Sequence, residues 1–228
     1  MSPKIMKRFI KGNSIEAMKL MSAESVDLIL TDPPYKTITG GDSGGKNSER
    51  PSGMLKGNRK LFKYQSVSIS SWMPEIYRVL KNGSHAYVFT NVLNLKEMLT
   101  VADLAGFKLH NLLIWQKNNC TPSQYYMKNC EYVLFLRKGK AKYVNNIGGS
   151  KTVHQFNNII GKKTHPCEKP IELLKFYIAN STKVGDIVFD PFAGTASTLI
   201  AAKELSREYL GYEVDEKYYN IGKKRLGI

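Results

Sequence analysis

The sequence predicts an α/β protein with a mostly parallel β-sheet and helices on both of its faces. Short apolar runs of strand character alternate with longer segments of helical pattern along nearly the whole chain. The 228 residues, of which 42% are hydrophobic, suffice for one domain with a substantial core. No repeat and no linker divides the chain, so we expect a single domain over residues 1–228.

The expected elements follow one another in a regular order. Apolar runs rich in β-branched or aromatic residues predict strands at 26–30, 86–89, 112–115, 132–136, 186–190 and 209–213. Helices are predicted at 71–80, 93–105, 170–180, 197–205 and 216–225, the first of them ended by Asn82-Gly83. A Gly- and Ser-rich stretch after the first strand has neither period. We expect it to form a mobile, functional loop over residues 36–63.

The charge of the chain indicates a polyanionic partner. The formal net charge is +15, and the segment 115–163 contains a single acid, Glu131. Its basic residues are Lys117, Lys128, Arg137, Lys138, Lys140, Lys142, Lys151, Lys162 and Lys163. A protein that contacts many phosphates needs such an excess, whereas a generally lysine-rich composition is the alternative explanation. The clustering of the charge favours contact with a nucleic acid.

Several other kinds of site and location are not supported by the sequence. The three cysteines, Cys120, Cys130 and Cys167, lack a C-x-x-C spacing, and the four histidines are scattered. We therefore expect neither a disulfide framework nor a metal site. The chain has no apolar run of about 18–20 residues and no apolar segment behind its first residues. This predicts a cytoplasmic protein without membrane contact.

The first motif with a chemical meaning, Asp32-Pro33-Pro34-Tyr35, follows the strand expected at 26–30. In open α/β sheets, ligands bind at the carboxyl ends of the strands, where this motif lies. The exocyclic amine of a base is a poor nucleophile because its lone pair is delocalised into the ring. The Asp32 carboxylate and the Pro33 carbonyl could each accept one N–H of such an amine, while Tyr35 stacks on the base. A turn that merely ends the strand is the alternative.

The second motif is a turn of small residues between a strand and a helix, Asp190-Pro191-Phe192-Ala193-Gly194-Thr195-Ala196-Ser197-Thr198. Such a turn lets a ligand approach the backbone and the amides at the helix N-terminus. Glu213 ends the next strand, at the distance where an acid binds ribose hydroxyls in nucleoside-binding β-α-β units. The pattern predicts a nucleoside site, and a simple glycine turn is the alternative.

Together the two motifs resemble those of the amino-methyltransferases of DNA. That family combines an Asp/Asn/Ser-Pro-Pro-aromatic tetrapeptide with an Asp-Pro-Phe-x-Gly-x-Gly-Thr loop, and its His-Pro-Thr-Gln-Lys-Pro segment is similar to 164–170 here. The catalytic motif precedes the cofactor loop, as in the β class, and the basic segment 115–163 lies where that class has its target-recognition region. The resemblance implies a Rossmann-like methyltransferase fold with circularly permuted motifs, a mostly parallel seven-stranded sheet and a small basic recognition insertion.

The resemblance also implies the cofactor, S-adenosyl-L-methionine, and the residues of the site. The catalytic residues would be Asp32, Pro33, Pro34 and Tyr35. The cofactor would be bound by Asn13, Ser14, Asp32, His165, Lys169, Asp190, Phe192, Gly194, Ala196, Ser197 and Glu213. Two positions depart from the family, because Ala196 replaces a loop glycine and Asn13 replaces an aspartate. The alanine costs about 1 kcal/mol if its position needs a positive φ, whereas the Asn13 amide oxygen can still accept a hydrogen bond.

Contacts with DNA are expected in the basic segment, from Lys117, Tyr125, Tyr126, Lys128, Lys138, Lys140 and Lys142. The lysines would bind phosphates, and the two tyrosines would stack on, or wedge beside, the place that the target base leaves. A place in the hydrophobic core is an equal alternative for the tyrosines.

We predict an enzyme that methylates adenine N6 in double-stranded DNA after flipping the base out of the helix. Cytosine N4 is the alternative target. An RNA or protein-glutamine methyltransferase would more usually have Asn-Pro-Pro-Tyr and the opposite motif order. A DNA-binding regulator that retains an inactive fold is a further alternative. A homodimer and a companion restriction endonuclease are also compatible with this class.

Overall fold

The described part of the chain forms one eight-stranded sheet. A computed structural model describes residues 8–34, 67–121, 126–140, 142–159, 161 and 168–228. The strand order is β1-β8-β7-β2-β3-β5-β4-β6. Neighbouring strands are parallel except around β5, which runs antiparallel to β3 and β4. The strands are β1 (Arg8–Lys11), β2 (Val26–Thr31), β3 (Leu80–Thr90), β4 (Lys108–Thr121), β5 (Lys128–Arg137), β6 (Val153–Gln155), β7 (Ile187–Asp190) and β8 (Glu208–Glu213).

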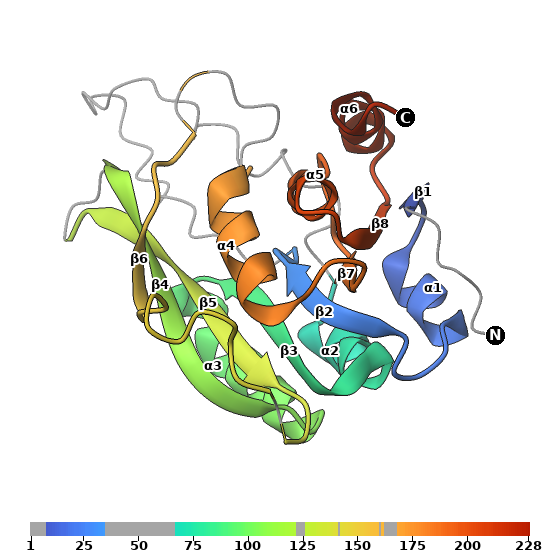
Figure 1. Cartoon of the computed structure of the whole chain (residues 1–228), viewed down its shortest axis with the longest axis horizontal. Helices are drawn as coiled ribbons and strands as arrows, with labels where there is room; N and C mark the ends of the chain where they lie inside the picture. The colour runs from blue at the N-terminus through green and yellow to red at the C-terminus, as the bar shows by residue number, and fades with distance from the viewer. Residues whose placement is uncertain (1–7, 35–66, 122–125, 141, 160, 162–167) are drawn as a thin grey trace, which may run out of the picture.

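Helices cover both faces of this sheet (Figure 1). One layer consists of α1 (Ser14–Leu20), α2 (Ile69–Val79) and α3 (Val92–Leu104), and the other of α4 (Ile171–Ser181), α5 (Ser197–Glu204) and α6 (Glu216–Leu226). The predicted α/β fold with a mostly parallel sheet between two helical layers is confirmed.

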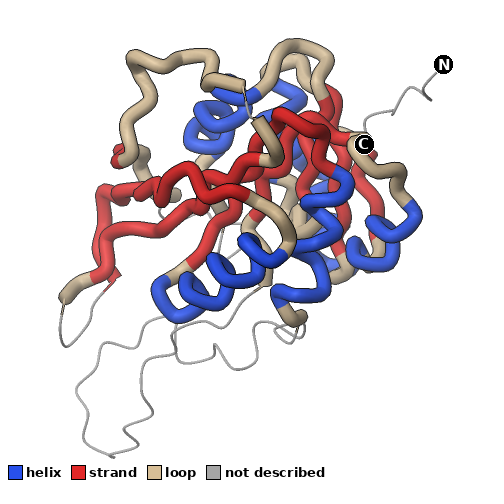
Figure 2. Tube along the Cα trace, turned by 90° about the horizontal axis from the view of Figure 1, so that it is seen from below, coloured by secondary structure: helices blue, strands red, loops and turns tan. Residues whose placement is uncertain are grey.

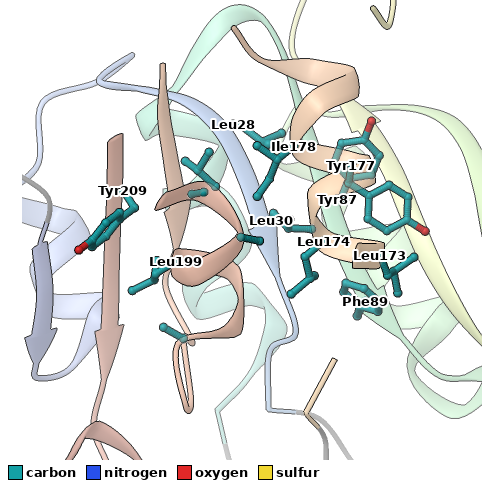
Figure 3. Close-up of a cluster of buried hydrophobic side chains, with 14 of the residues drawn as sticks. Leu28, Leu30, Tyr87, Phe89, Leu173, Leu174, Tyr177, Ile178, Leu199 and Tyr209 are labelled. Atoms are coloured by element: carbon teal, nitrogen blue, oxygen red, sulfur yellow. The ribbon is translucent and has the colours of Figure 1, made fainter. Parts of the chain in front are cut away.

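Each face of the sheet has its own hydrophobic core. On one face, Met18, Trp72 and Met98 belong to a cluster from α1, α2 and α3 packed on the sheet. On the other face, four apolar side chains of α4 lie over Leu28 and Leu30 of β2 and over the aromatic rings of β3 (Figure 3). The apolar side chains of β2 are divided between the two cores, with Leu28 and Leu30 in one and Val26 and Ile29 in the other. β2 is therefore buried on both faces, as the apolar run 26–30 predicts.

The structure differs from the sequence prediction at several elements. The sheet has eight strands where seven were expected, and the three-residue strand β6 is too short to show a pattern in the sequence. β1 and α1 also lie outside the predicted elements. The Asn13 side chain starts α1 by accepting a hydrogen bond from the amide of Ile15 (3.0 Å).

The junction between α2 and β3 corrects one predicted boundary. Asn82-Gly83 was expected to end the helix, but α2 ends at Val79 and these two residues lie within β3. Gly83 has a φ of +78°, and the register with β2 shifts between the pairs Val26–Leu80 and Leu28–His85. The glycine therefore allows an irregular backbone conformation within β3 and does not end a helix.

The basic segment 115–163 belongs partly to the sheet. β5 lies between β3 and β4, and Val133 to Leu136 are part of the hydrophobic core. β4 and β5 together form a long hairpin that extends past the helical layers (Figure 2). The candidate recognition region is therefore the outer part of a hairpin that the sheet itself supports.

The described residues contain neither a membrane-spanning helix nor a metal-binding cluster. Among them, no helix has the length and apolar character needed to cross a bilayer. The same residues contain no group of three or more His, Cys, Asp or Glu side chains arranged for a metal ion. The loop expected at 36–63 lies outside the described residues.

Candidate active site

The two sequence motifs meet at the carboxyl ends of adjacent strands. Asp32 follows β2, Asp190 ends β7, and these strands pair in parallel through Leu28–Val188 and Ile29–Phe189. The hydroxyl of Thr31 donates a hydrogen bond of 2.7 Å to the Asp190 carboxylate. Two residues 159 positions apart in the sequence thus hold the start of the predicted catalytic motif, Asp32 to Pro34, beside the expected cofactor loop.

Asp190 is a structural centre of this junction. Its side chain is buried, and the carboxylate that accepts from Thr31 also accepts from the amide of Phe192 (3.1 Å). Burial raises the pKa of Asp190 to about 6, although hydrogen bonds from Thr198, Thr31 and Phe192 oppose this shift. Asp190 was expected to contact the cofactor. Its hydrogen bonds with Thr31 and Phe192 attach the loop to β2, and its contact with the cofactor stays a prediction.

The loop itself leaves space for a ligand beside Gly194. This residue has a φ of +53°, and a Cβ built on it would meet no atom within 4 Å. The Glu213 carboxylate accepts hydrogen bonds from the amides of Gly194 (2.8 Å) and Asp215 (2.7 Å). Burial raises the pKa of Glu213. An open glycine turn next to an acid at a strand end fits a nucleoside with ribose hydroxyls, as the sequence predicts.

Two other residues of the loop face away from this space. Ala196 is fully buried in the left-handed conformation (φ +68°, ψ 24°), and its side chain belongs to the core near Gly222 of α6. Ser197 is buried as well, and its hydroxyl lies 3.1 Å from Nη1 of Arg225. Both were expected to bind the cofactor. Their side chains instead attach the loop to α6.

The remaining predicted cofactor residues lie around the same edge. The amide of Gly12 donates to the carbonyl of Glu213 (2.9 Å), which brings Asn13 and the buried Ser14 next to the end of β8. Phe192 is half-buried, with its ring edge-on to Trp72 at 5.7 Å between centroids. Asn13 and Phe192 remain candidates for contact with an adenine ring.

Lys169 was also expected to bind the cofactor, and the structure pairs it with Asp32, another of the predicted cofactor residues. Its ammonium forms an ion pair with the Asp32 carboxylate and lies 3.2 Å from the Glu131 carboxylate. The same ammonium lies over the ring of Phe89, 4.9 Å from the ring centroid. This lysine is therefore paired with the carboxylate that the sequence predicts to be catalytic.

The expected DNA contacts divide between the two edges of the sheet. Lys128 and Tyr126 lie at the outer end of the β4–β5 hairpin, and the Tyr126 side chain is 92% exposed. The core alternative for Tyr126 is thereby excluded. Tyr35, Tyr125 and His165 lie outside the described residues.

Four of the predicted DNA-binding lysines need correction. The Lys117 ammonium is paired with Glu131 and lies over the ring of Trp115. Lys138 is buried, and its ammonium donates to the carbonyl of Leu80 (2.7 Å). Lys138, Lys140 and Lys142 follow the end of β5, which pairs with the start of β3 and thus lies at the edge opposite Asp32. Phosphates bound at the edge where Asp32 lies would not reach these last three lysines.

Two residues at the site were not predicted as site residues. Glu131 was noticed only as the single acid of the basic segment, and this isolation is the signal that could have identified it. Arg225 of α6 donates to the carbonyl (2.8 Å) and hydroxyl (2.9 Å) of Thr195 and pairs with Glu168 (2.6 Å). No pattern in the sequence indicates this role, because the partners come from segments far apart.

A family model and curated relatives identify the family of this chain. The family model described as DNA methylase matches residues 26–224. The chain belongs to the N6/N4 DNA methylase family. The methylase is 31% identical to the type II methyltransferase M.HinfI of Haemophilus influenzae, over 95% of this chain and 67% of that protein. It is 29% identical to the type II methyltransferase M2.DpnII of Streptococcus pneumoniae, over 95% of this chain and 88% of its relative.

Solved structures agree with the fold of the methylase. The complex of M1.HpyAVI with SAM superimposes with a TM-score of 0.70 at 23% identity, over 97% of this chain and 99% of that one. The PvuII DNA methyltransferase, named as cytosine-N4-specific, gives a TM-score of 0.72 at 18% identity, over 96% and 85% of the two chains. At these identities the likeness concerns the fold alone.

Proposed function

We propose that the methylase transfers a methyl group from S-adenosyl-L-methionine to the N6 amine of adenine in double-stranded DNA. The observation that carries the proposal is the junction of β2 and β7, where Thr31 and Asp190 join the Asp32-Pro33-Pro34 turn to the glycine loop. A base and a nucleoside cofactor bound at these two neighbouring turns would lie side by side. This is the arrangement that direct methyl transfer requires.

In this proposal the protein makes the amine a better nucleophile. The Asp32 carboxylate accepts one N–H of the amine, and the carbonyl of the buried Pro33 accepts the other. Hydrogen bonds to both protons favour a tetrahedral nitrogen, whose lone pair is no longer delocalised into the ring. The ion pair with Lys169 keeps the Asp32 carboxylate in one orientation. Preorganised acceptors of this kind contribute through electrostatics rather than covalent chemistry.

The residues that would hold the cofactor surround the open loop. Glu213 would accept ribose hydroxyls, the backbone at Gly194 would allow close approach, and Phe192 would pack against the adenine ring. Asn13 would accept from the adenine amine. When bound, S-adenosyl-L-methionine supplies an activated methyl group on a positively charged sulfur. M1.HpyAVI, which shares this fold, has been solved as its SAM complex.

Adenine is our preferred target because the tetrapeptide begins with aspartate. Cytosine N4 is the second candidate, since the PvuII enzyme, which has a similar fold, is named as cytosine-N4-specific. The exocyclic amines of the two bases offer the same two N–H donors, so the acceptors at Asp32 and Pro33 do not distinguish them.

DNA would approach along the carboxyl edge of the sheet. The exposed Tyr126 and Lys128 lie on the hairpin at this edge, where they can contact the duplex beside the flipped base. We propose the outer part of segment 115–163 as the target-recognition region. A homodimer and a companion endonuclease remain predictions.

The test is expression of the methylase in a host that lacks DNA methylation, followed by single-molecule sequencing that detects modified bases. We expect N6-methyladenine at one short sequence and its loss in Asp32→Ala. The control is Asp103→Ala, which removes an exposed carboxylate from the end of α3. N4-methylcytosine would replace our proposal by the second candidate, and unmodified DNA would favour the inactive regulator. A mutant Asp32→Ala with more than about a tenth of the wild-type kcat would refute the role of Asp32.

A further inference from the structure

Four charged side chains form a continuous line along the carboxyl edge of the sheet. The line starts at Asp32 after β2 and continues through Lys169, which precedes α4, to Glu131 of β5 and Lys117 of β4. Lys169 contacts both carboxylates, and Glu131 contacts both ammonium groups. The charges alternate in sign, and those of the four side chains cancel.

The line is largely shielded from water. The Lys169 side chain is 8% exposed, that of Lys117 17% and that of Glu131 25%. The ammonium groups of Lys169 and Lys117 lie 4.9 Å from the ring centres of Phe89 and Trp115, both of which are buried. In such surroundings charges interact more strongly than in water, and removal of one partner leaves an uncompensated charge.

Glu131 is the centre of this balance. Burial on its own would raise the pKa of Glu131, but the nearby ammonium groups of Lys169 and Lys117 outweigh it and lower the pKa to about 2. Glu131 is thus ionised at neutral pH. Its position opposite Trp115 in the β4–β5 ladder is determined by the sheet, so the carboxylate is held on a rigid element.

We propose that Glu131 is a positioning residue for methyl transfer, which balances the charge of Lys169 and thereby lets this lysine orient Asp32 without an excess of positive charge at the target amine. The inference rests on the proposed role of Asp32. Neither the sequence motifs nor the comparisons assign a function to Glu131 or to its pair with Lys117.

The reaction explains why an excess of positive charge would be harmful. The lone pair of the amine nitrogen forms the bond to the methyl carbon while the carbon–sulfur bond breaks and its electron pair returns to sulfur. The nitrogen gains positive charge during this step, until one N–H proton passes to solvent. Without Glu131, Lys169 and Lys117 would carry one positive charge more than Asp32 balances, and this excess would oppose the developing charge and lower kcat.

The test uses the charge balance itself. Glu131→Gln leaves one excess positive charge, and we expect kcat to fall on the order of 10-fold, with KM for the cofactor and for DNA changed less than about 3-fold. Lys117→Met alone leaves one excess negative charge, which does not oppose the developing positive charge, so kcat should stay within about 3-fold of wild type. The double variant restores the balance, so its kcat should recover to within about 3-fold of wild type.

Three controls accompany these variants. Glu204→Gln removes an exposed carboxylate from an ion pair with Lys175 at the far end of α5, so it makes the same change of net charge away from the site. Glu131→Asp retains the charge and should keep at least about a third of the activity. Denaturation curves and calorimetric cofactor affinity, measured for every variant, separate an effect on catalysis from one on folding or binding.

The outcomes discriminate between the possibilities. A purely structural role predicts that the double variant is worse than either single variant, because more packing is lost. That result, or an unchanged kcat in folded Glu131→Gln, would overturn the inference. If Asp32→Ala is inactive in the same assay, the proposed function survives such a failure. If Asp32→Ala is active, the proposed function fails whatever Glu131 does.

Discussion

The two edges of the sheet use buried polar side chains in different ways. At the amino edge, Lys138 donates to the carbonyl of Leu80, Arg207 donates to those of Thr182 and Leu205, and the buried His85 ring contacts both the Ser181 hydroxyl and the carbonyl of Lys142. At the carboxyl edge, Glu213 and Asp190 also accept from main-chain amides, but here charged side chains pair with one another as well, in the line from Asp32 to Lys117. Main-chain partners fix the fold, whereas side-chain partners keep chemically useful groups oriented.

The direction of β5 explains why a cluster of charge in the sequence is not a cluster in space. β5 has 10 residues and runs antiparallel to its neighbours, so it crosses the whole sheet. At about 3.4 Å per residue, its two ends lie about 30 Å apart. Lys128 therefore remains at the catalytic edge, while Lys138, Lys140 and Lys142 belong to the other.

The largest effect that we expect concerns the pH dependence of stability at the carboxyl edge. The folded pKa of Asp190 is raised to about 6, so between about pH 4 and 6 the folded protein keeps a proton that the unfolded chain has released. The free energy of unfolding therefore falls as the pH rises through this window. Asp190→Asn has no proton to lose, and its amide oxygen can still accept from Thr31. We expect this variant to exceed wild type in stability by about 2–3 kcal/mol at pH 7, and by much less at pH 4.

Urea denaturation at both pH values measures this difference. At the amino edge, His85 acts with the opposite sign, because burial lowers its pKa and stability is lost as the pH falls below about 6.5. That contribution is common to wild type and Asp190→Asn and cancels in the comparison. Equal pH dependence of the two proteins would contradict the buried environment of Asp190.

At the amino edge, Lys138→Met should lower the free energy of unfolding by about 1–3 kcal/mol, because the carbonyl of Leu80 loses its buried donor. Methionine keeps the apolar part of the side chain, and kcat per folded molecule should not change. The exposed neighbour provides the matched control, since Lys140→Met should change stability by less than about 0.5 kcal/mol. Weaker DNA binding at unchanged stability would return Lys138 to the DNA contacts.

Glu213→Ala should weaken binding of S-adenosyl-L-methionine on the order of 10-fold, through one lost charge-assisted hydrogen bond to the ribose. Binding of DNA alone should hardly change. Glu208 begins the same strand at the opposite edge, so Glu208→Ala is the matched control and should leave cofactor affinity unaltered. Calorimetry on both variants decides, and equal affinities would remove Glu213 from the site.

Lys128→Gln should make DNA binding less dependent on salt. Each phosphate contact contributes about 0.9 to the slope of log K against log salt, which is about a 3-fold effect between 50 and 200 mM. The double variant Lys140→Gln/Lys142→Gln should leave the slope unchanged, because both residues lie at the amino edge. The reverse result, with the slope reduced only in the double variant, would place the DNA on the opposite edge.

The smallest expected effect is that of Ala196→Gly. Glycine relieves the left-handed conformation, worth about 1 kcal/mol, but removes a buried methyl group that contributes about 0.8 kcal/mol. The two terms oppose each other, so stability should change by less than about 0.5 kcal/mol. Cofactor affinity should stay within about 2-fold, since the alanine side chain faces α6. A large gain in affinity would show that the methyl group restricts the cofactor site.

The sequence by itself determined the order of the longer elements from β2 onward and the two turns predicted to carry the chemistry. Local patterns suffice for this, because the period of apolar residues distinguishes strands from helices. The residues at a strand end also reach the ligand-binding edge in any parallel sheet. Asp32, Gly194 and Glu213 lie where their motifs predict.

Only the tertiary structure decided which charged groups meet. Lys169 lies 137 residues from Asp32, and neither residue's neighbours in the sequence indicate the contact. The antiparallel direction of β5 brought Glu131 to the catalytic edge and took Lys138 away from it. The side chain of Ala196, whose backbone is left-handed, lies against Gly222 of α6, a residue distant in the sequence. Strand pairing and burial act between distant segments, so their consequences for charge cannot be inferred from local sequence.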